Sequence, residues 1–262
     1  MAKRMYGQYC GLARASDVVG ERWAMLIIRD LLVRDQRFGD LKRGLPRIPT
    51  NVLTNRLKSL EEAGVVERKL LAQPRNTVVY TLTEYGRGLE EIVLALGRWG
   101  ARMLGEPDPD EIVTPESLVM ALRSTFHPEV AGSDSASFEL RVGPDVVLHA
   151  VLDRGALTVA PGPYGSAAPA PVPVPAGAPV PFGAPVPVPF PARAPAPVRA
   201  SDAPTAPPAA EAPGPDLTIT SGPAIRAVMA GELTPAEAVA QGAVTLDGDP
   251  ALFDDFARYF RI

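Results

Sequence analysis

The chain contains one cysteine, Cys10, and two histidines, His127 and His149, among 262 residues. A single cysteine excludes an intramolecular disulfide framework. One cysteine and two widely separated histidines do not supply the ligands of a zinc finger. The sequence therefore predicts no metal site, and nothing in it calls for a cofactor.

Long apolar runs are also missing. No stretch approaches the roughly 18 consecutive apolar residues of a membrane-spanning helix, and Lys3 and Arg4 lead into no apolar segment. We therefore expect neither a membrane span nor a secretory signal.

Catalytic motifs are absent as well. The sequence has no glycine-rich phosphate loop and no G-x-S-x-G motif, and the acids near its end lack calcium-loop spacing: Asp247, Asp249, Asp254 and Asp255. We predict no catalytic residue, and hence a protein that is not an enzyme.

Proline, by contrast, is abundant. Of the 30 prolines, 19 lie from Pro161 to Pro215, whereas average usage would give about 13 in the whole chain. Alternating Pro-Val and Pro-Ala units lack ladder donors and favour extended polyproline II. We interpret residues 161–215 as a disordered Pro/Ala-rich insertion.

Charge divides the chain in two. Residues 1–105 hold 18 Lys and Arg against 11 Asp and Glu, whereas residues 106–262 hold 8 against 19. A basic domain suggests a polyanionic partner. We predict a basic domain over 1–105, a proline-containing hinge over 106–111 and an acidic domain over 112–262.

The basic half contains a series of helical and strand patterns. Apolar residues over 23–32 predict a buried helix, and residues 37–46 predict a two-turn helix that stops at a Gly and a Pro. The next helix has Thr50 as a good N-cap and closes at residues 63–64. A short helix and a tight turn before this helix are typical of a helix-turn-helix.

One face of that third helix is polar. Asn51, Thr54, Asn55 and Lys58 recur at i, i+3, i+4 and i+7. Asn pairs bidentately with adenine, Thr meets a thymine methyl or a phosphate, and Lys reaches guanine or phosphate. A solvated face is the alternative, but the basic domain favours a recognition helix for double-stranded DNA. Thr50 and Arg47 are also predicted to contact DNA.

Residues 65–70 and 77–82 are β-rich and predict a hairpin. Its tip carries Arg75 and Asn76, which would reach the minor groove or the phosphates. A last helix over 84–103 bears an apolar stripe formed by Leu89, Ile92, Val93, Leu96, Trp99 and Met103. That stripe packs either on its own domain or on a second chain, and a homodimer would double the DNA contacts.

These elements form a winged helix-turn-helix, and several blocks resemble the HxlR-type winged-helix transcription regulators of bacteria. The blocks are Cys10–Ala15, Gly20–Trp23, Arg37–Leu41, Asn51–Leu57, Leu60–Val66 and Tyr80–Gly86. The resemblance covers nearly all of residues 6–103 and implies a homodimer on a promoter palindrome. Gly11 and the tip residues 75–77 depart from the family pattern. The resemblance therefore supports the predicted DNA contacts of the wing less than it supports those of the third helix.

The resemblance also places Cys10 where many members carry a cysteine, which in some of them senses oxidants or electrophiles. A half-buried, inert thiol is the alternative. No second cysteine is present to resolve a sulfenic acid, so any disulfide would join two chains. Nearby Lys3, Arg4 and Arg14 would lower its pKa.

The acidic half predicts an α+β domain. Thr114–Glu116 is a helix start, and three strand-like runs follow over 136–142, 146–152 and 156–160. Beyond the insertion, residues 216–220 form another strand. Thr234 to Glu237 is a capping box, and a last helix carries a wide apolar face. Helices on one antiparallel sheet, interrupted by the Pro/Ala-rich loop, are the predicted architecture.

Four blocks of this half resemble a sterol carrier protein type 2-like domain: Gly222–Ile225, Gly231–Ala238, Gly242–Pro250 and Leu252–Phe253. The resemblance implies an apolar tunnel for a lipid-like ligand. Its candidate lining is Val228, Met229, Leu233, Phe253, Phe256 and Phe260. Most of these side chains equally suit a hydrophobic core.

Together these observations predict a bacterial one-component transcription regulator, cytoplasmic and nucleoid-associated. A dimeric winged helix would read DNA, and the C-terminal domain would bind a hydrophobic small-molecule effector or stabilise the dimer. Two alternatives stay open: a hydrophobic-ligand carrier whose winged helix serves protein contacts, and a regulator with redox input through Cys10.

Overall fold

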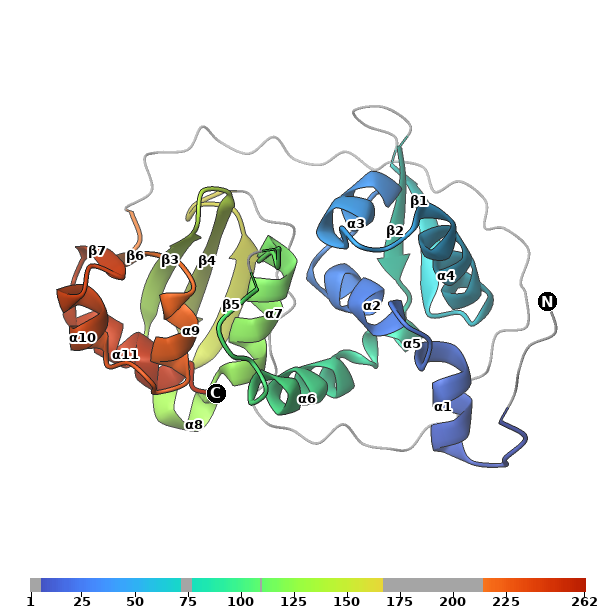
Figure 1. Ribbon diagram of the computed structural model, residues 1–262, viewed down its shortest axis with the longest axis horizontal. Coiled ribbons are helices and arrows are strands. Elements are labelled where there is room, and N and C mark those ends of the chain that lie inside the picture. Colours follow the sequence, from blue (N-terminus) through green and yellow to red (C-terminus); the bar gives the residue numbers. More distant parts are fainter. Residues whose placement is uncertain (1–5, 72–76, 109, 167–213) are drawn as a thin grey trace.

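The computed structural model describes residues 6–71, 77–108, 110–166 and 214–262. A helical domain with a two-stranded hairpin lies beside a domain built on a five-stranded sheet (Figure 1). Within the described residues, no helix is both long and apolar enough to cross a bilayer.

Four helices open the N-terminal domain: α1 (Gly11–Val19), α2 (Ala24–Val33), α3 (Phe38–Gly44) and α4 (Thr50–Glu62). An antiparallel hairpin of β1 (Val66–Leu71) and β2 (Thr77–Leu82) follows. Helix α2 is the buried centre of this domain, because its apolar side chains pack against one face of α4 and against the base of the hairpin. The predicted helix, turn, helix and wing are thus confirmed.

Two details of the predicted helices are wrong. Pro49, not Thr50, is the N-cap of α4, so Thr50 lies in the first turn. The predicted helix over 84–103 is two helices, α5 (Glu84–Arg87) and α6 (Glu90–Ala101). The chain breaks between them because α5 is tied to the hairpin: the Thr83 hydroxyl accepts from Gly86 N and donates to Gly64 O. A Cβ on Gly86 would lie 2.1 Å from Val65 O.

The C-terminal domain begins with α7 (Pro115–Thr125), which is capped by Thr114 as predicted, and α8 (Pro128–Ala131). Strands β3 (Ala136–Val142), β4 (Val146–Asp153) and β5 (Ala156–Pro161) follow. After the insertion come β6 (Leu217–Ser221), α9 (Ala224–Met229), α10 (Pro235–Ala240), β7 (Val244–Gly248) and α11 (Ala251–Tyr259).

The sheet is mixed, whereas an antiparallel sheet was predicted. Its strand order is β5-β4-β3-β6-β7, and β6 pairs with β3 in parallel, with Leu140 opposite Ile219. The chain therefore leaves at the β5 edge and returns on the far side of β3, running in the same direction as β3. A connection between parallel strands must cross the sheet, which a short hairpin loop cannot do. Most of the predicted disordered insertion, residues 167–213, lies outside the described residues. Its predicted start is wrong: Pro161 ends β5, and the Tyr164 N–H donates to Glu139 Oε2 at 2.8 Å.

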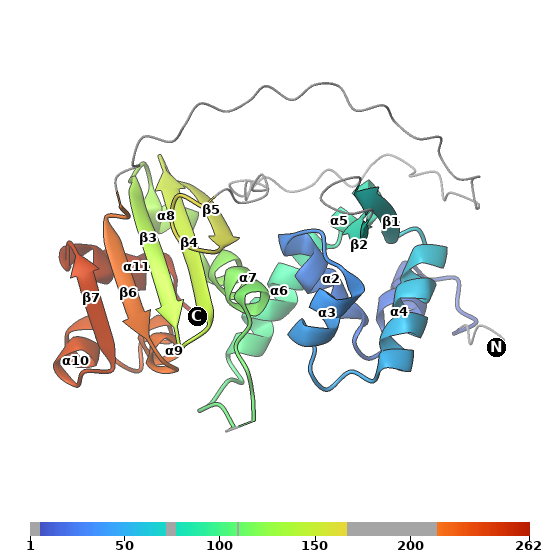
Figure 2. The same cartoon turned by 90° about the horizontal axis from the view of Figure 1, so that it is seen from above.

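The helices of the second domain cover one face of this sheet (Figure 2). The centre of that layer is aromatic: Phe256 lies 5.5 Å from Phe138 and 4.7 Å from Phe260, measured between ring centroids. Strand β7 and helices α8 and α9 were not predicted as elements. They are short, so their periodicity is weak.

Helix α7 belongs to both domains. It packs against α2 and α6 on one side and against β4 and β5 on the other. Met120 of α7 is part of the N-terminal core, while Leu118 and Leu122 are part of the C-terminal core. Hence the residues beyond the predicted hinge are packed onto the N-terminal domain.

Candidate nucleic-acid interface

Helix α4 has one buried and one exposed face. Leu53, Leu57 and Leu60 are buried in the N-terminal core. The predicted base-reading residues are exposed on the opposite face: Asn51, Thr54, Asn55 and Lys58. This face results from the 3.6-residue period, which the leucines fix by packing.

The exposed polar side chains of α4 form few and weak interactions with the rest of the protein. The Thr54 hydroxyl donates to Thr50 O at 2.9 Å within the helix. Lys58 Nζ lies 3.8 Å from Glu62 Oε1, and both side chains are largely exposed. An exposed pair of this kind is worth only about 0–1 kcal/mol. A phosphate or a base edge can therefore displace it at small cost.

Helix α4 lies on the side of the N-terminal domain that faces away from the C-terminal sheet (Figures 1 and 2). The C-terminal domain packs instead through α7 onto α2 and α6. In this arrangement the polar face of α4 stays open to a large partner.

Arg47, in the turn between α3 and α4, is exposed and forms an ion pair with Asp110 of the hinge. The sequence placed Arg47 among the DNA contacts but gave no sign of this partner, which lies 63 residues away. A carboxylate on Arg47 occupies the position that a phosphate would take. The hinge thus competes for one predicted DNA contact.

Arg75 and Asn76 lie outside the described residues. The adjoining strand β1 carries two exposed cations that the sequence analysis did not select. Arg68 donates to Glu61 Oε2 through both Nε and Nη2 and lies over the Tyr80 ring, while Lys69 pairs with Glu67. Arg68 and Lys69 are adjacent on a strand of the predicted wing, and two neighbouring cations at that place are the signal that was available.

Cys10 is exposed at the start of α1. The backbone N–H groups of Ala13 and Leu12 lower the pKa of its thiol, because hydrogen bonds to the thiolate favour the charged form. The expected half-buried position is therefore wrong, since α1 projects from the domain. Among the described residues, the groups that lower this pKa are backbone N–H groups at the helix start. Lys3 and Arg4, which were also expected to lower it, lie outside the described residues.

The residues predicted to line a tunnel lie in the core of the second domain. Val228, Met229, Phe253, Phe256 and Phe260 are buried, and Leu233 is partly buried against them. Their role in ligand binding stays a prediction. Across the described residues, no group of three or more His, Cys, Asp or Glu side chains is placed to hold a metal ion.

Comparison with known proteins agrees with this geometry. The family model for the HxlR-like helix-turn-helix matches residues 18–108. The chain is 34% identical over 112 residues to the HTH-type transcriptional regulator YkvN of Bacillus subtilis (strain 168), covering 42% of this chain and 95% of YkvN. It is 32% identical over 93 residues to the regulator YdeP of the same organism, covering 36% of this chain and 73% of YdeP.

Among solved structures, the redox regulator HypR in its oxidized form is 34% identical in sequence. The likeness covers 37% of this chain and all of HypR, with a TM-score of 0.35. The family model matches residues 18–108, which contain the helix, turn, helix and wing, and the identity to YkvN extends over nearly all of that protein. The chain therefore belongs to the HxlR-like helix-turn-helix family of transcriptional regulators.

Proposed function

We propose that this protein binds promoter DNA as a homodimer, with α4 as the recognition helix in the major groove. The observation that carries this proposal is the exposed polar face of α4 opposite its three buried leucines. Its residues are those that pair with base edges and phosphates: Asn51, Thr54, Asn55 and Lys58.

The proposed dimer rests on two apolar surfaces. Ile92, Leu96 and Trp99 are exposed along α6, and Met103 and Leu104 continue that surface. Helix α1 buries only Ala13 fully and exposes Leu12, while Tyr6 and Tyr9 before it are exposed too. Apolar surface of this extent is typical of a protein interface. A second copy of the chain would cover it.

The C-terminal domain we assign, by resemblance, to the sterol carrier protein type 2-like class, as a sensor of a hydrophobic effector. Its support is the Phe-rich layer between the sheet and α11. An effector regulates only if it binds one arrangement of the dimer more tightly than another.

A second candidate input is oxidation at Cys10, and it is favoured by the exposure of this thiol and by its lowered pKa. A thiolate is the nucleophile in thiol oxidation. Because Cys10 is the only cysteine in the chain, the expected product is a disulfide between two protomers or a mixed disulfide.

The test of DNA binding is a selection from fragmented genomic DNA with the purified full-length protein, followed by affinity measurements over a range of salt. Lys58→Ala should weaken all selected sites and flatten the salt dependence by about one phosphate contact. Asn55→Ala should relax base preference at one or two positions. Glu62→Ala, which removes only the weak partner of Lys58, is the control and should not weaken binding. Recovery of no enriched sequence would refute the proposal.

A further inference from the structure

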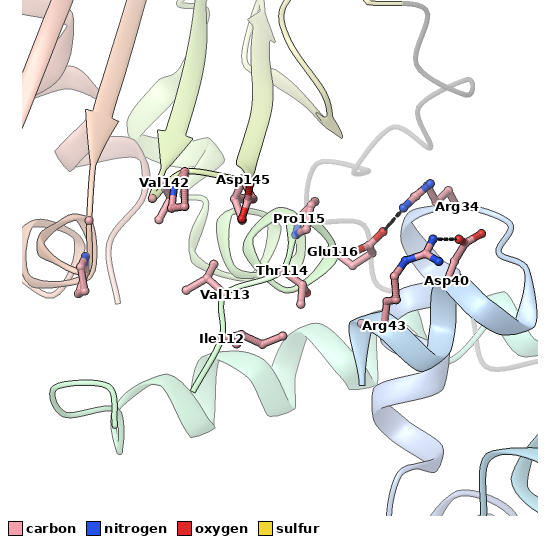
Figure 3. Close-up of a pocket in the computed structure, with 16 residues that line it drawn as sticks. Arg34, Asp40, Arg43, Ile112, Val113, Thr114, Pro115, Glu116, Val142 and Asp145 are labelled. Carbon is pink, nitrogen blue, oxygen red and sulfur yellow. Dashed lines mark hydrogen bonds and ion pairs between the residues drawn. The ribbon is translucent and has the colours of Figure 1, made fainter. Parts of the chain in front are cut away.

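A cavity of about 690 Å³ lies where the two domains meet (Figure 3). Arg34, Asp40, Arg43 and Gly44 form its wall on the N-terminal domain. The other walls are the segment 112–116, the turn 142–146 between β3 and β4, and residues 222–223 before α9. Its volume is in the range of small-molecule sites, about 300–1,000 Å³.

The lining of the cavity is mostly apolar, and two of its apolar side chains are exposed. Ile112 and Val113 are about half exposed, and they lie on the segment that leads into α7. Figure 3 shows both beside the cavity, below the start of α7. Apolar side chains on the wall of a cavity are stabilised when an apolar group displaces water from them.

The charges around the cavity do not balance. Arg34 is paired with Glu116, and Arg43 is paired with Asp40 (Figure 3). Asp145, in the turn between β3 and β4, also lines the cavity. In the part of the chain that the structure describes, its carboxylate has no ion pair and no hydrogen bond. The lining therefore carries one uncompensated negative charge.

A buried carboxylate lies close behind this lining. Asp30 is fully buried, its Oδ1 accepts from Arg29, and its Oδ2 has no hydrogen-bond partner among the described residues. A Cβ added to Gly44 would lie 3.2 Å from Asp30 Oδ2. Since Gly44 is part of the wall, the Oδ2 atom of Asp30 lies close behind it, while the ion pair with Arg29 offsets the charge of this carboxylate.

We propose that this cavity binds a lipophilic cation: an organic molecule with an apolar body that lies on Ile112 and Val113, and one positive charge next to Asp145. Arg34 and Arg43 already have acidic partners, so an anion would have to compete with Glu116 and Asp40. A cation meets an unpaired carboxylate instead. The walls come from both domains, so the bound molecule stabilises their docked arrangement.

The experiment uses the full-length protein without DNA, so its result does not depend on the proposed regulatory role. Calorimetric titration compares tetraphenylphosphonium with tetraphenylborate, which have nearly the same size and shape and opposite charge. We expect saturable binding of one phosphonium per chain, and at least about fivefold weaker binding of the borate.

Three variants then locate the site. Asp145→Asn should weaken phosphonium binding about fivefold, and Val113→Trp should abolish it by filling the cavity. Asp247→Asn, which removes an exposed acid on β7 outside the lining, should leave binding unchanged. Asp145 and Val113 are exposed, so both variants should fold, which circular dichroism checks.

The proposal is overturned if there is no saturable phosphonium binding, if borate binds as tightly as phosphonium, or if Asp145→Asn or Val113→Trp leaves phosphonium binding unchanged. If Asp247→Asn weakened phosphonium binding as much as Asp145→Asn does, the loss would result from the change in net charge and not from the cavity. That result would also overturn the proposal.

Discussion

The guanidinium of Arg34, at the end of α2, lies 2.6 Å from the carboxylate of Glu116 in the first turn of α7, measured from Nη2 to Oε1. Arg34 Nε donates to the same oxygen at 2.9 Å. The Glu116 side chain is only 6% exposed, whereas that of Arg34 is 39% exposed. This pair therefore joins the two domains at the edge of their interface.

Arg34→Ala should destabilise the full-length protein by about 1–3 kcal/mol, because it leaves a buried carboxylate without its cation. Lys69→Ala, which breaks an exposed pair on β1, should cost less than about 0.5 kcal/mol. Urea unfolding followed by circular dichroism measures both. Equal stabilities of the two variants would contradict the structural role of the pair.

A second ion pair, Arg123 of α7 with Glu90 of α6, lies deeper in the same interface. The Arg123 side chain is 5% exposed, and burial lowers the pKa of its guanidinium to about 10. Glu90→Ala should destabilise the protein by about 3–5 kcal/mol, since it strands a buried cation.

The double variant Glu90→Leu with Arg123→Met should recover most of that loss, because two apolar side chains need no ionic partner. Chemical denaturation of the single and double variants gives the comparison. A double variant less stable than Glu90→Ala alone would show that packing, not the unpaired charge, dominates at this position.

Asp30 makes stability depend on pH. Burial raises the pKa of its carboxyl from 3.8 to about 6, against the opposing effect of Arg29; Glu116 raises it further and Arg34 lowers it. The folded state thus holds the proton more tightly than the unfolded chain does. The proton on Asp30 therefore contributes fully to stability below the pKa that Asp30 has in the unfolded chain. This contribution is lost as the pH rises through about 6.

Between pH 7.5 and pH 5, the free energy of unfolding of the natural protein should therefore rise by about 1 kcal/mol relative to that of Asp30→Asn. Thermal or urea unfolding at several pH values measures this difference. A constant difference across the range, or one of opposite sign, would contradict the raised pKa.

DNA affinity should rise when Arg47 is released from the hinge. Asp110→Asn removes the partner of Arg47, so the guanidinium becomes free for a phosphate, and affinity should increase by up to about fivefold. Asp108→Asn removes a neighbouring hinge acid for which no ion pair occurs among the described residues. Fluorescence anisotropy on a selected site compares the two. An equal gain in both would mean that only net charge matters.

The apolar surface of α6 should hold the second protomer. Trp99 is 64% exposed in the single chain, and aromatic residues in interface centres contribute at least about 2 kcal/mol. Trp99→Arg should therefore raise the dimer dissociation constant about thirtyfold or more. Tyr85→Arg, at an exposed aromatic on α5, serves as the control in sedimentation equilibrium. A monomeric natural protein would contradict the proposed dimer outright.

Local sequence patterns are sufficient to predict the main helices and strands and the two faces of α4. Leu53, Leu57 and Leu60 recur with the helical period, so the exposure of Asn55 and Lys58 on the opposite side follows directly. Thr114 and Thr234 begin α7 and α10 as their capping patterns predict. Such signals lie within a few residues and need no knowledge of distant parts of the chain.

Contacts between distant groups, in contrast, follow from the folded arrangement of the chain and cannot be predicted from local patterns. The parallel pairing of β6 with β3, the ion pairs of Arg34 with Glu116 and of Arg47 with Asp110, and the cavity beside Asp145 all join segments far apart in the chain. No periodicity encodes these contacts, because each depends on how segments that are distant in the chain pack against one another. The sequence around a charged residue does not show whether its partner is water, a phosphate or a carboxylate. The partner of Arg34 is a carboxylate 82 residues away.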